Sequence, residues 1–148
     1  MLTRIVGALA LAVVIPATAV VAADHSHSHS PAATAAPSAG RMATDAALRQ
    51  GMEGIRTTMV AALAKRPGPA DYPRMANDVE AGIDRITATC KLDPEADARL
   101  HLVLARMIDG IGHLRGTDKQ QAGVALILGA LDEYGRGFDH PGWVGFGH

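Results

Sequence analysis

The chain has 148 residues, a formal net charge of −1 and only 3% aromatic residues. Its length fits one domain, and its balanced charge excludes the basic surface that nucleic-acid binding requires. The shortage of aromatic residues, beside abundant Ala, Leu, Ile, Val and Met, favours helices over sheets.

The first 23 residues have the pattern of a signal peptide. Arg4 is followed by an apolar run over residues 5–15, then by Pro16 and by small residues that end at Ala23. We therefore expect cleavage near Ala23, a periplasmic mature protein and no stable membrane insertion after cleavage. The alternative is an uncleaved signal anchor, since the uncharged stretch is almost long enough to span a bilayer.

Residues 24–43 are predicted to form a flexible arm, because the stretch from Asp24 to Gly40 has no large apolar residue to bury. Its histidines His25, His27 and His29 alternate with serines and resemble a His-rich metal-binding tract. Imidazoles in such a tract bind Cu(II), Ni(II) or Zn(II). The alternative is a solvated spacer.

Four amphipathic helices are predicted over residues 44–135. The first begins with Thr44 as N-cap and ends before the breaker at residues 66–69, and the second covers about residues 71–91. The third begins with Asp93 as N-cap and Pro94 at N1 and ends near Gly116. The fourth follows Thr117 and ends at residues 135–137.

Apolar residues recur along each helix at the spacing of a bundle-facing stripe. In chain order the stripes are Leu48, Met52, Ile55, Met59 and Leu63; Tyr72, Met75, Val79, Ile83, Ile86 and Cys90; Leu100, Leu104, Met107, Ile111 and Leu114; Val124, Ile127, Leu128, Leu131 and Tyr134. With short connections, these helices predict an all-α, up-down-up-down four-helix bundle. The glycine-rich tail over residues 136–148 holds the only Trp and both Phe residues, so we expect it to fold onto the bundle.

This topology brings four candidate metal ligands toward one end of the bundle: Cys90, His101, His140 and Met52 (or Met42). Thiolate and thioether select Cu(I), and imidazole binds copper and zinc. Cys90 is the only cysteine, so it cannot form an internal disulfide and is a free thiol, an intermolecular bridge or a ligand. Each residue also has a structural interpretation: buried Cys and Met fill cores, and a histidine near a helix end caps carbonyls.

Several segments resemble a group of small exported proteobacterial proteins with His-rich N-termini, labelled DnrO-like. The resemblance rests on residues 44–52, on the Cys90–Asp97 segment with Leu100-His101, and on Phe138-Asp139-His140-Pro141-Gly142-Trp143. It implies export, a helical domain and an association with copper handling, with Cys90, His101, His140 and Met52 as signature positions. The chain departs from the pattern at Met42, where the family often has Trp.

The sequence thus predicts a periplasmic protein that binds copper, with zinc as the second candidate, as a buffer or carrier and without catalysis. No phosphate-binding glycine loop and no nucleophile–base pair at a recognisable spacing points to an enzyme. Two alternatives stay open. One is a metal-free bundle that binds another periplasmic protein, and the other is a b-type haem site with Met52 and His101 as axial ligands.

Overall fold

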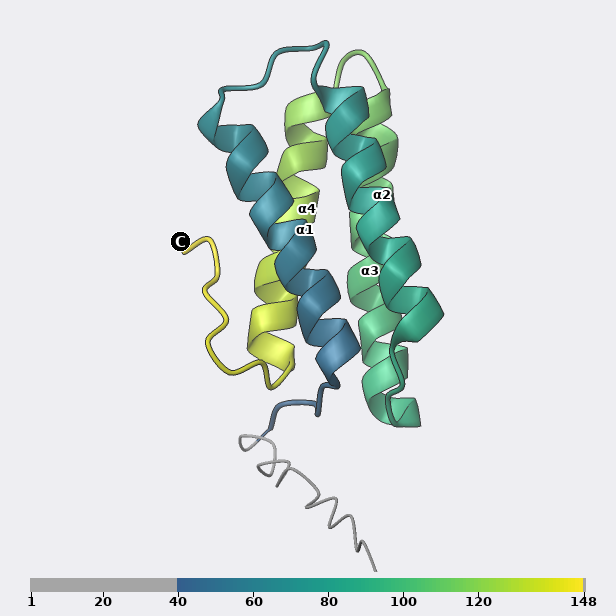
Figure 1. Cartoon of the computed structure of the whole chain (residues 1–148). Coiled ribbons are helices and arrows are strands. Elements are labelled where there is room, and N and C mark those ends of the chain that lie inside the picture. The colour runs from purple at the N-terminus through teal and green to yellow at the C-terminus, as the bar shows by residue number, and fades with distance from the viewer. Residues whose placement is uncertain (1–39, 148) are drawn as a thin grey trace, which may run out of the picture. The chain divides into compact units, whose positions relative to one another are not determined.

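The computed structural model describes residues 40–147, and within this range the chain forms four α-helices and no β-strand. These helices are α1 (Ala46–Ala64), α2 (Tyr72–Thr89), α3 (Pro94–Arg115) and α4 (Gln120–Gly137). The α1–α2 and α3–α4 connections lie at one end and the α2–α3 connection at the other (Figure 1). The predicted all-helical class is confirmed, and the arrangement is consistent with a four-helix bundle.

Four predictions concern residues outside this range. The signal peptide over residues 1–23, its cleavage near Ala23, the flexible arm as far as residue 39 and the histidines His25, His27 and His29 all lie outside the described residues. Within residues 40–147, no helix is long and apolar enough to cross a membrane.

Asp45, rather than the predicted Thr44, is the N-cap of α1. Its carboxylate accepts a hydrogen bond of 2.6 Å from the backbone N–H of Leu48, which satisfies one of the unpaired donors in the first turn. The Thr44 hydroxyl donates instead to the carbonyl oxygen of Asp139, at 2.6 Å. The prediction of Thr44 was wrong by one residue because both residue types can cap a helix.

The start of α3 matches its sequence signal. Asp93 accepts a hydrogen bond from the N–H of Ala96 at 2.9 Å, and Pro94 occupies the first helical position. Glu95 and Asp97 place negative charge in the first turn, and Arg115 places positive charge in the last, so each end complements the helix dipole.

Most of the predicted stripe residues form the core, and four of them are only partly buried against it: Leu63, Cys90, Val124 and Leu128. Its fully buried side chains include Met52 and Met59 of α1, Ile86 of α2 and Met107 of α3, each 0% exposed. Burying apolar side chains of this size contributes about 1.5–3 kcal/mol each before the entropy cost of folding is subtracted. Tyr134 of α4 is also fully buried and closes the core beside the C-terminal segment.

Glycines set how closely the paired helices approach. A Cβ at Gly51 of α1 would overlap Ile86 of α2, and a Cβ at Gly82 of α2 would overlap Ile55 of α1. Each isoleucine therefore occupies the space that its partner helix leaves free at a glycine. Gly110 of α3 makes the corresponding approach to α4.

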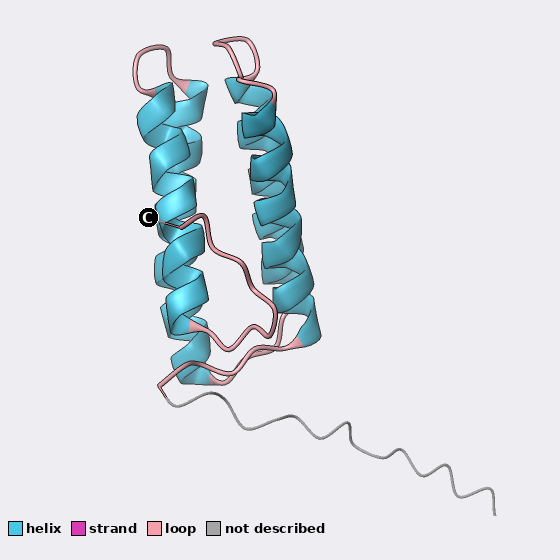
Figure 2. Ribbon diagram, turned by 90° about the vertical axis from the view of Figure 1, so that its left-hand side faces the viewer, coloured by secondary structure: helices cyan, strands magenta, loops and turns pink. Residues whose placement is uncertain are grey.

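The segment after α4 runs back along the helices (Figures 1 and 2). Phe138 is fully buried and pairs with Met42, the residue that leads into α1, in an isolated bridge. Trp143 packs edge-on against Tyr134, with ring centroids 4.9 Å apart, and the N–H of Phe146 donates to the carboxylate of Asp132 at 2.9 Å. Two of these contacts hold the tail against α4, and the third joins Phe138 to the segment before α1.

Candidate functional site

Cys90 lies immediately after α2, not within its last turn. Its backbone is extended (φ −70°, ψ 146°), while its N–H still donates to the carbonyl oxygen of Ile86 at 2.9 Å. The side chain is half-buried and packs against the core. Burial and the neighbouring carboxylates of Asp45 and Asp97 raise the pKa of the Cys90 thiol, so at neutral pH it is held as the protonated thiol.

His101 lies on the outer surface of α3, with 68% of its side chain exposed. Its Nδ1 is 2.9 Å from the carbonyl oxygen of Asp97, one turn earlier in the helix. A carbonyl oxygen can only accept a hydrogen bond, so Nδ1 carries the proton in the neutral ring. This contact leaves the Nε2 lone pair available, which is how metal-binding histidines are commonly oriented.

Asp97 links the surroundings of Cys90 and His101. Its carboxylate lies 3.5 Å from Nδ1 of His101, and its charge is also close enough to raise the pKa of the Cys90 thiol. Asp45 approaches from the start of α1, where its second carboxylate oxygen accepts the N–H of Lys91. Asp97 is therefore the residue that links two of the four candidate ligands, Cys90 after α2 and His101 in α3.

His140 belongs to a different environment, formed by α4 and the tail. Its Nδ1 lies 2.9 Å from the hydroxyl of Tyr134, and its ring contacts Trp143 with centroids 5.1 Å apart. Burial lowers the pKa of His140; the charges of Arg49 and Arg56 lower it further, and Glu53 opposes them. All three charged groups belong to α1, so His140 lies where α1 faces α4.

Met52 is fully buried in the core, whereas His101 is on the surface. The structure therefore brings neither residue to the other. Met52, Cys90, His101 and His140 were expected to lie together at one end of the bundle. Instead, Met52 lies in the core, Cys90 and His101 lie near Asp97, and His140 lies against the aromatic residues of the tail. Within residues 40–147, no three His, Cys, Asp or Glu side chains are grouped as ligands for a metal ion.

Sequence analysis missed three residues that shape these surroundings. Asp97 could have been found, because it lies four residues before His101 and such pairs share a helix face. Asp45 and Tyr134 carry no comparable signal. The contact from Asp45 to Lys91 joins residues 46 positions apart in the chain. In the sequence Tyr134 looks like an ordinary core residue, and its contact with the tail appears only in the folded structure.

Comparison of the chain with protein families, curated proteins and solved structures finds no match.

Proposed function

We propose that this protein is exported to the periplasm and binds a transition metal there, copper first and zinc second, as a buffer or carrier without catalysis. The proposed bundle site uses the thiolate of Cys90 and Nε2 of His101. The single observation that carries it is the hydrogen bond from Nδ1 of His101 to the carbonyl oxygen of Asp97, which leaves the Nε2 lone pair of His101 free for a metal.

The donor chemistry favours Cu(I). A thiolate is a soft ligand and an imidazole a borderline one, and Cu(I) accepts both at low coordination number. Because the pKa of the Cys90 thiol is raised by burial and by Asp45 and Asp97, metal binding has to displace its proton. Binding should therefore tighten as the pH rises.

The experiment is an anaerobic Cu(I) titration against a competing chelator. The protein is the mature chain with His25, His27 and His29 replaced by Gln, so that the arm does not contribute. We expect one Cu(I) per chain, with binding lost in Cys90→Ala and weakened at least tenfold in His101→Gln. His113→Gln, which changes another histidine of α3, is the matched control and should bind as the parent does.

Binding no stronger than that of a urea-unfolded sample would contradict the bundle site. Equal binding by the parent and by Cys90→Ala would place the metal elsewhere. Restoring the three arm histidines then measures the contribution of the arm, which we propose as a second and weaker site for Cu(II) or Zn(II).

For His140 or Met52 to bind the metal beside Cys90, its side chain would first have to move. His140 is held by Tyr134 and Trp143, and Met52 is in the core. The variants His140→Gln and Met52→Leu, carried through the same titration, show whether either joins Cys90. A haem held between Met52 and His101 would need a still larger rearrangement, and a Soret band in the purified protein would reveal it.

A metal-free interaction bundle is the second candidate. It draws on two large apolar side chains that α3 exposes, Leu102 at 68% and Ile108 at 54% exposure. A partner that covered α3 would remove these side chains from water. Undiminished partner binding by Cys90→Ala and His101→Ala would favour this function over metal binding.

The same proposal includes the up-down-up-down order of the helices and removal of residues 1–23 as a signal peptide. The alternating positions of the connections support the helix order (Figure 1). The export signal is supported by the sequence pattern around Arg4, Pro16 and Ala23.

A further inference from the structure

One face of α3 is exposed along most of the helix. We call seven of its exposed residues the outer face: Ala98, His101, Leu102, Ala105, Ile108, Asp109 and Gly112. The buried residues Val103, Met107 and Leu114 lie on the opposite side of α3, since each is 0% exposed. The outer face therefore leaves two large apolar side chains, Leu102 and Ile108, in contact with water.

The middle of the outer face is a line of small residues. Ala98, Ala105 and Gly112 are seven residues apart, about two helical turns, so they lie one above the other along α3. A glycine inside a helix is less stable than an alanine. A Cβ at Gly112 would meet no atom within 4 Å, so packing within residues 40–147 does not require a glycine there. Small residues along one line allow a second helix to approach closely.

The outer face is self-complementary about Ala105. Leu102 and Ile108 lie three residues before and after it, and the pair His101 and Asp109 lies four residues before and after it. In an antiparallel pair of α3 helices with Ala105 on the two-fold axis, residues at equal distances from Ala105 have the same height. Leu102 of one copy then lies beside Ile108 of the other, and His101 lies beside Asp109. A parallel pair would place each of these residues beside its own copy.

The two ends of α3 favour the same antiparallel arrangement. Glu95 and Asp97 place negative charge in the first turn, and His113 and Arg115 are in the last turn. Antiparallel copies bring the acidic first turn of each helix near the last turn of the other, where the helix dipoles also attract. Arg115 is already paired with Glu80 of α2, so the choice of register depends mainly on the residues around Ala105.

We propose that the outer face of α3 is the contact surface between two copies of this chain, which pair antiparallel about a two-fold axis at Ala105. A two-fold interface uses the same patch on both copies, so each contact is made twice. One helix from each copy gives an interface smaller than the roughly 1,200 Å² of stable complexes. The dissociation constant is therefore on the order of 0.1 mM. The proposal does not depend on the metal site and is tested in metal-free protein.

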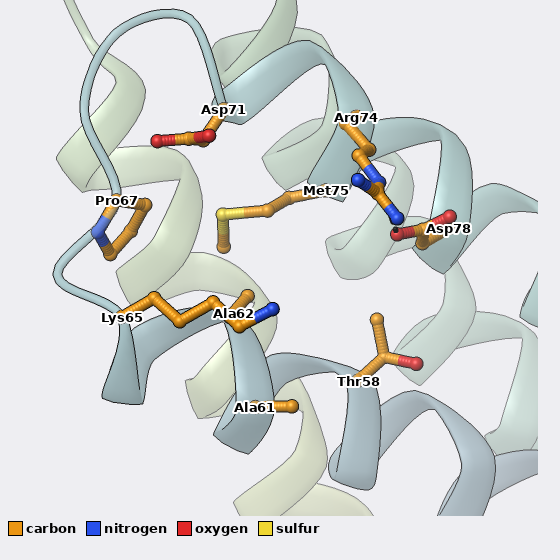
Figure 3. Close-up of a pocket in the computed structure, with 9 residues that line it drawn as sticks. All are labelled: Thr58, Ala61, Ala62, Lys65, Pro67, Asp71, Arg74, Met75 and Asp78. Atoms are coloured by element: carbon orange, nitrogen blue, oxygen red, sulfur yellow. Dashed lines mark ion pairs between the residues drawn. The ribbon is translucent and has the colours of Figure 1, made fainter.

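Cross-linking tests the position of the axis. In mature protein with Cys90→Ser, the variant Ala105→Cys places the two introduced thiols opposite each other, within the reach of a disulfide. Oxidised glutathione should convert it to a covalent dimer at least about tenfold faster than the matched control. That control is Ala61→Cys, at an exposed alanine that lines the cavity between α1 and α2 (Figure 3).

Sedimentation equilibrium at concentrations up to about 1 mM measures the association without a cross-link. Leu102→Gln should weaken it at least about tenfold, because each dimer loses two buried leucines. The matched control is Val60→Gln, which changes an exposed apolar residue of α1 and should associate as the parent does.

Exchange of charges tests the register. The double variant His101→Lys/Asp109→Lys places cations at both positions, and His101→Glu leaves carboxylates at both. Each protein alone should be monomeric because like charges face each other across the axis, whereas their mixture should associate at least as tightly as the parent. A parent that stays monomeric up to about 1 mM, equal cross-linking of Ala105→Cys and Ala61→Cys, or a mixture that does not associate would overturn the proposal.

Discussion

The hydroxyl of Tyr134 lies 2.9 Å from Nδ1 of His140, and this hydrogen bond joins a fully buried residue of α4 to the C-terminal tail. The same tyrosine ring packs against Phe138 and Trp143, with centroids 5.0 and 4.9 Å away. Tyr134 is thus the residue on which the tail is assembled. Burial raises the pKa of its hydroxyl, so the hydroxyl stays protonated and able to hydrogen-bond at any ordinary pH.

The position of His140 predicts that stability falls in mild acid. Burial lowers the pKa of His140 below its usual value of about 6.5, so below that pH the unfolded chain binds a proton that the folded chain resists. The stability that the folded protein keeps while His140 is neutral is therefore fully present above pH 6.5. It is lost as the pH falls from 6.5 through the lowered pKa of His140 in the folded protein. Urea unfolding between pH 5 and 7.5 measures it. His140→Gln should flatten the dependence, and an equally steep dependence in that variant would show that other groups cause it.

Gly135 predicts the effect of displacing the tail. A Cβ at this position would overlap the indole of Trp143, so Gly135→Ala should push the ring away and expose it to water. Because Trp143 is the only tryptophan, its fluorescence reports the change directly as a red-shifted emission. The expected loss of stability is about 1–3 kcal/mol, as for other overpacked sites.

Gly129→Ala is the control for this experiment, because Gly129 also lies in α4 and a Cβ there meets no atom within 4 Å. It should keep the emission maximum and gain roughly 0.5–1 kcal/mol from the helix propensity of alanine. Identical emission spectra for Gly135→Ala and Gly129→Ala would contradict the docking of Trp143 on α4.

The close contact between α1 and α2 predicts opposite effects at two glycines of one helix. Gly51→Ala should destabilise the fold by about 1–2 kcal/mol, because its overlap with Ile86 outweighs the gain in helix propensity. Gly54→Ala, three residues along α1, meets nothing within 4 Å and should stabilise by up to about 1 kcal/mol. Thermal unfolding of both variants gives the comparison. A gain in stability in both Gly51→Ala and Gly54→Ala would mean that α1 and α2 separate easily at Gly51.

A structural feature of this fold could be predicted from the sequence when the residues that form it are close together in the chain. The stripe through Met52 and Met59 and the cap at Asp93 are local patterns, and sequence analysis placed all of them. The pairing of Met42 with Phe138 joins the two ends of the domain and has no local signal. The reciprocal contacts of Gly51 and Gly82 also depend on the partner helix, so their role appears only once the helices are packed.

The candidate site shows the same division. The residue types Cys90 and His101 were identified from the sequence, because spacing along a helix gives the height of a residue. The position of a residue along its helix does not show whether its side chain points into the core or into solvent. Met52 and His101 lie at similar depths along α1 and α3, yet one points into the core and the other into solvent.

The final prediction concerns the reactivity of the Cys90 thiol in the absence of metal. Burial and the carboxylates of Asp45 and Asp97 raise its pKa, and only the thiolate attacks an alkylating agent. Alkylation by iodoacetamide at pH 8 should therefore be several-fold slower in the folded protein than in urea.

Asp97→Asn removes one of the two charges while keeping the shape of the side chain, so it should accelerate the reaction. Asp84→Asn, on the exposed face of α2, is the matched control and should not. A folded rate equal to that in urea, or an unchanged rate in Asp97→Asn, would show that Asp97 does not influence the thiol and would remove the link between Cys90 and His101.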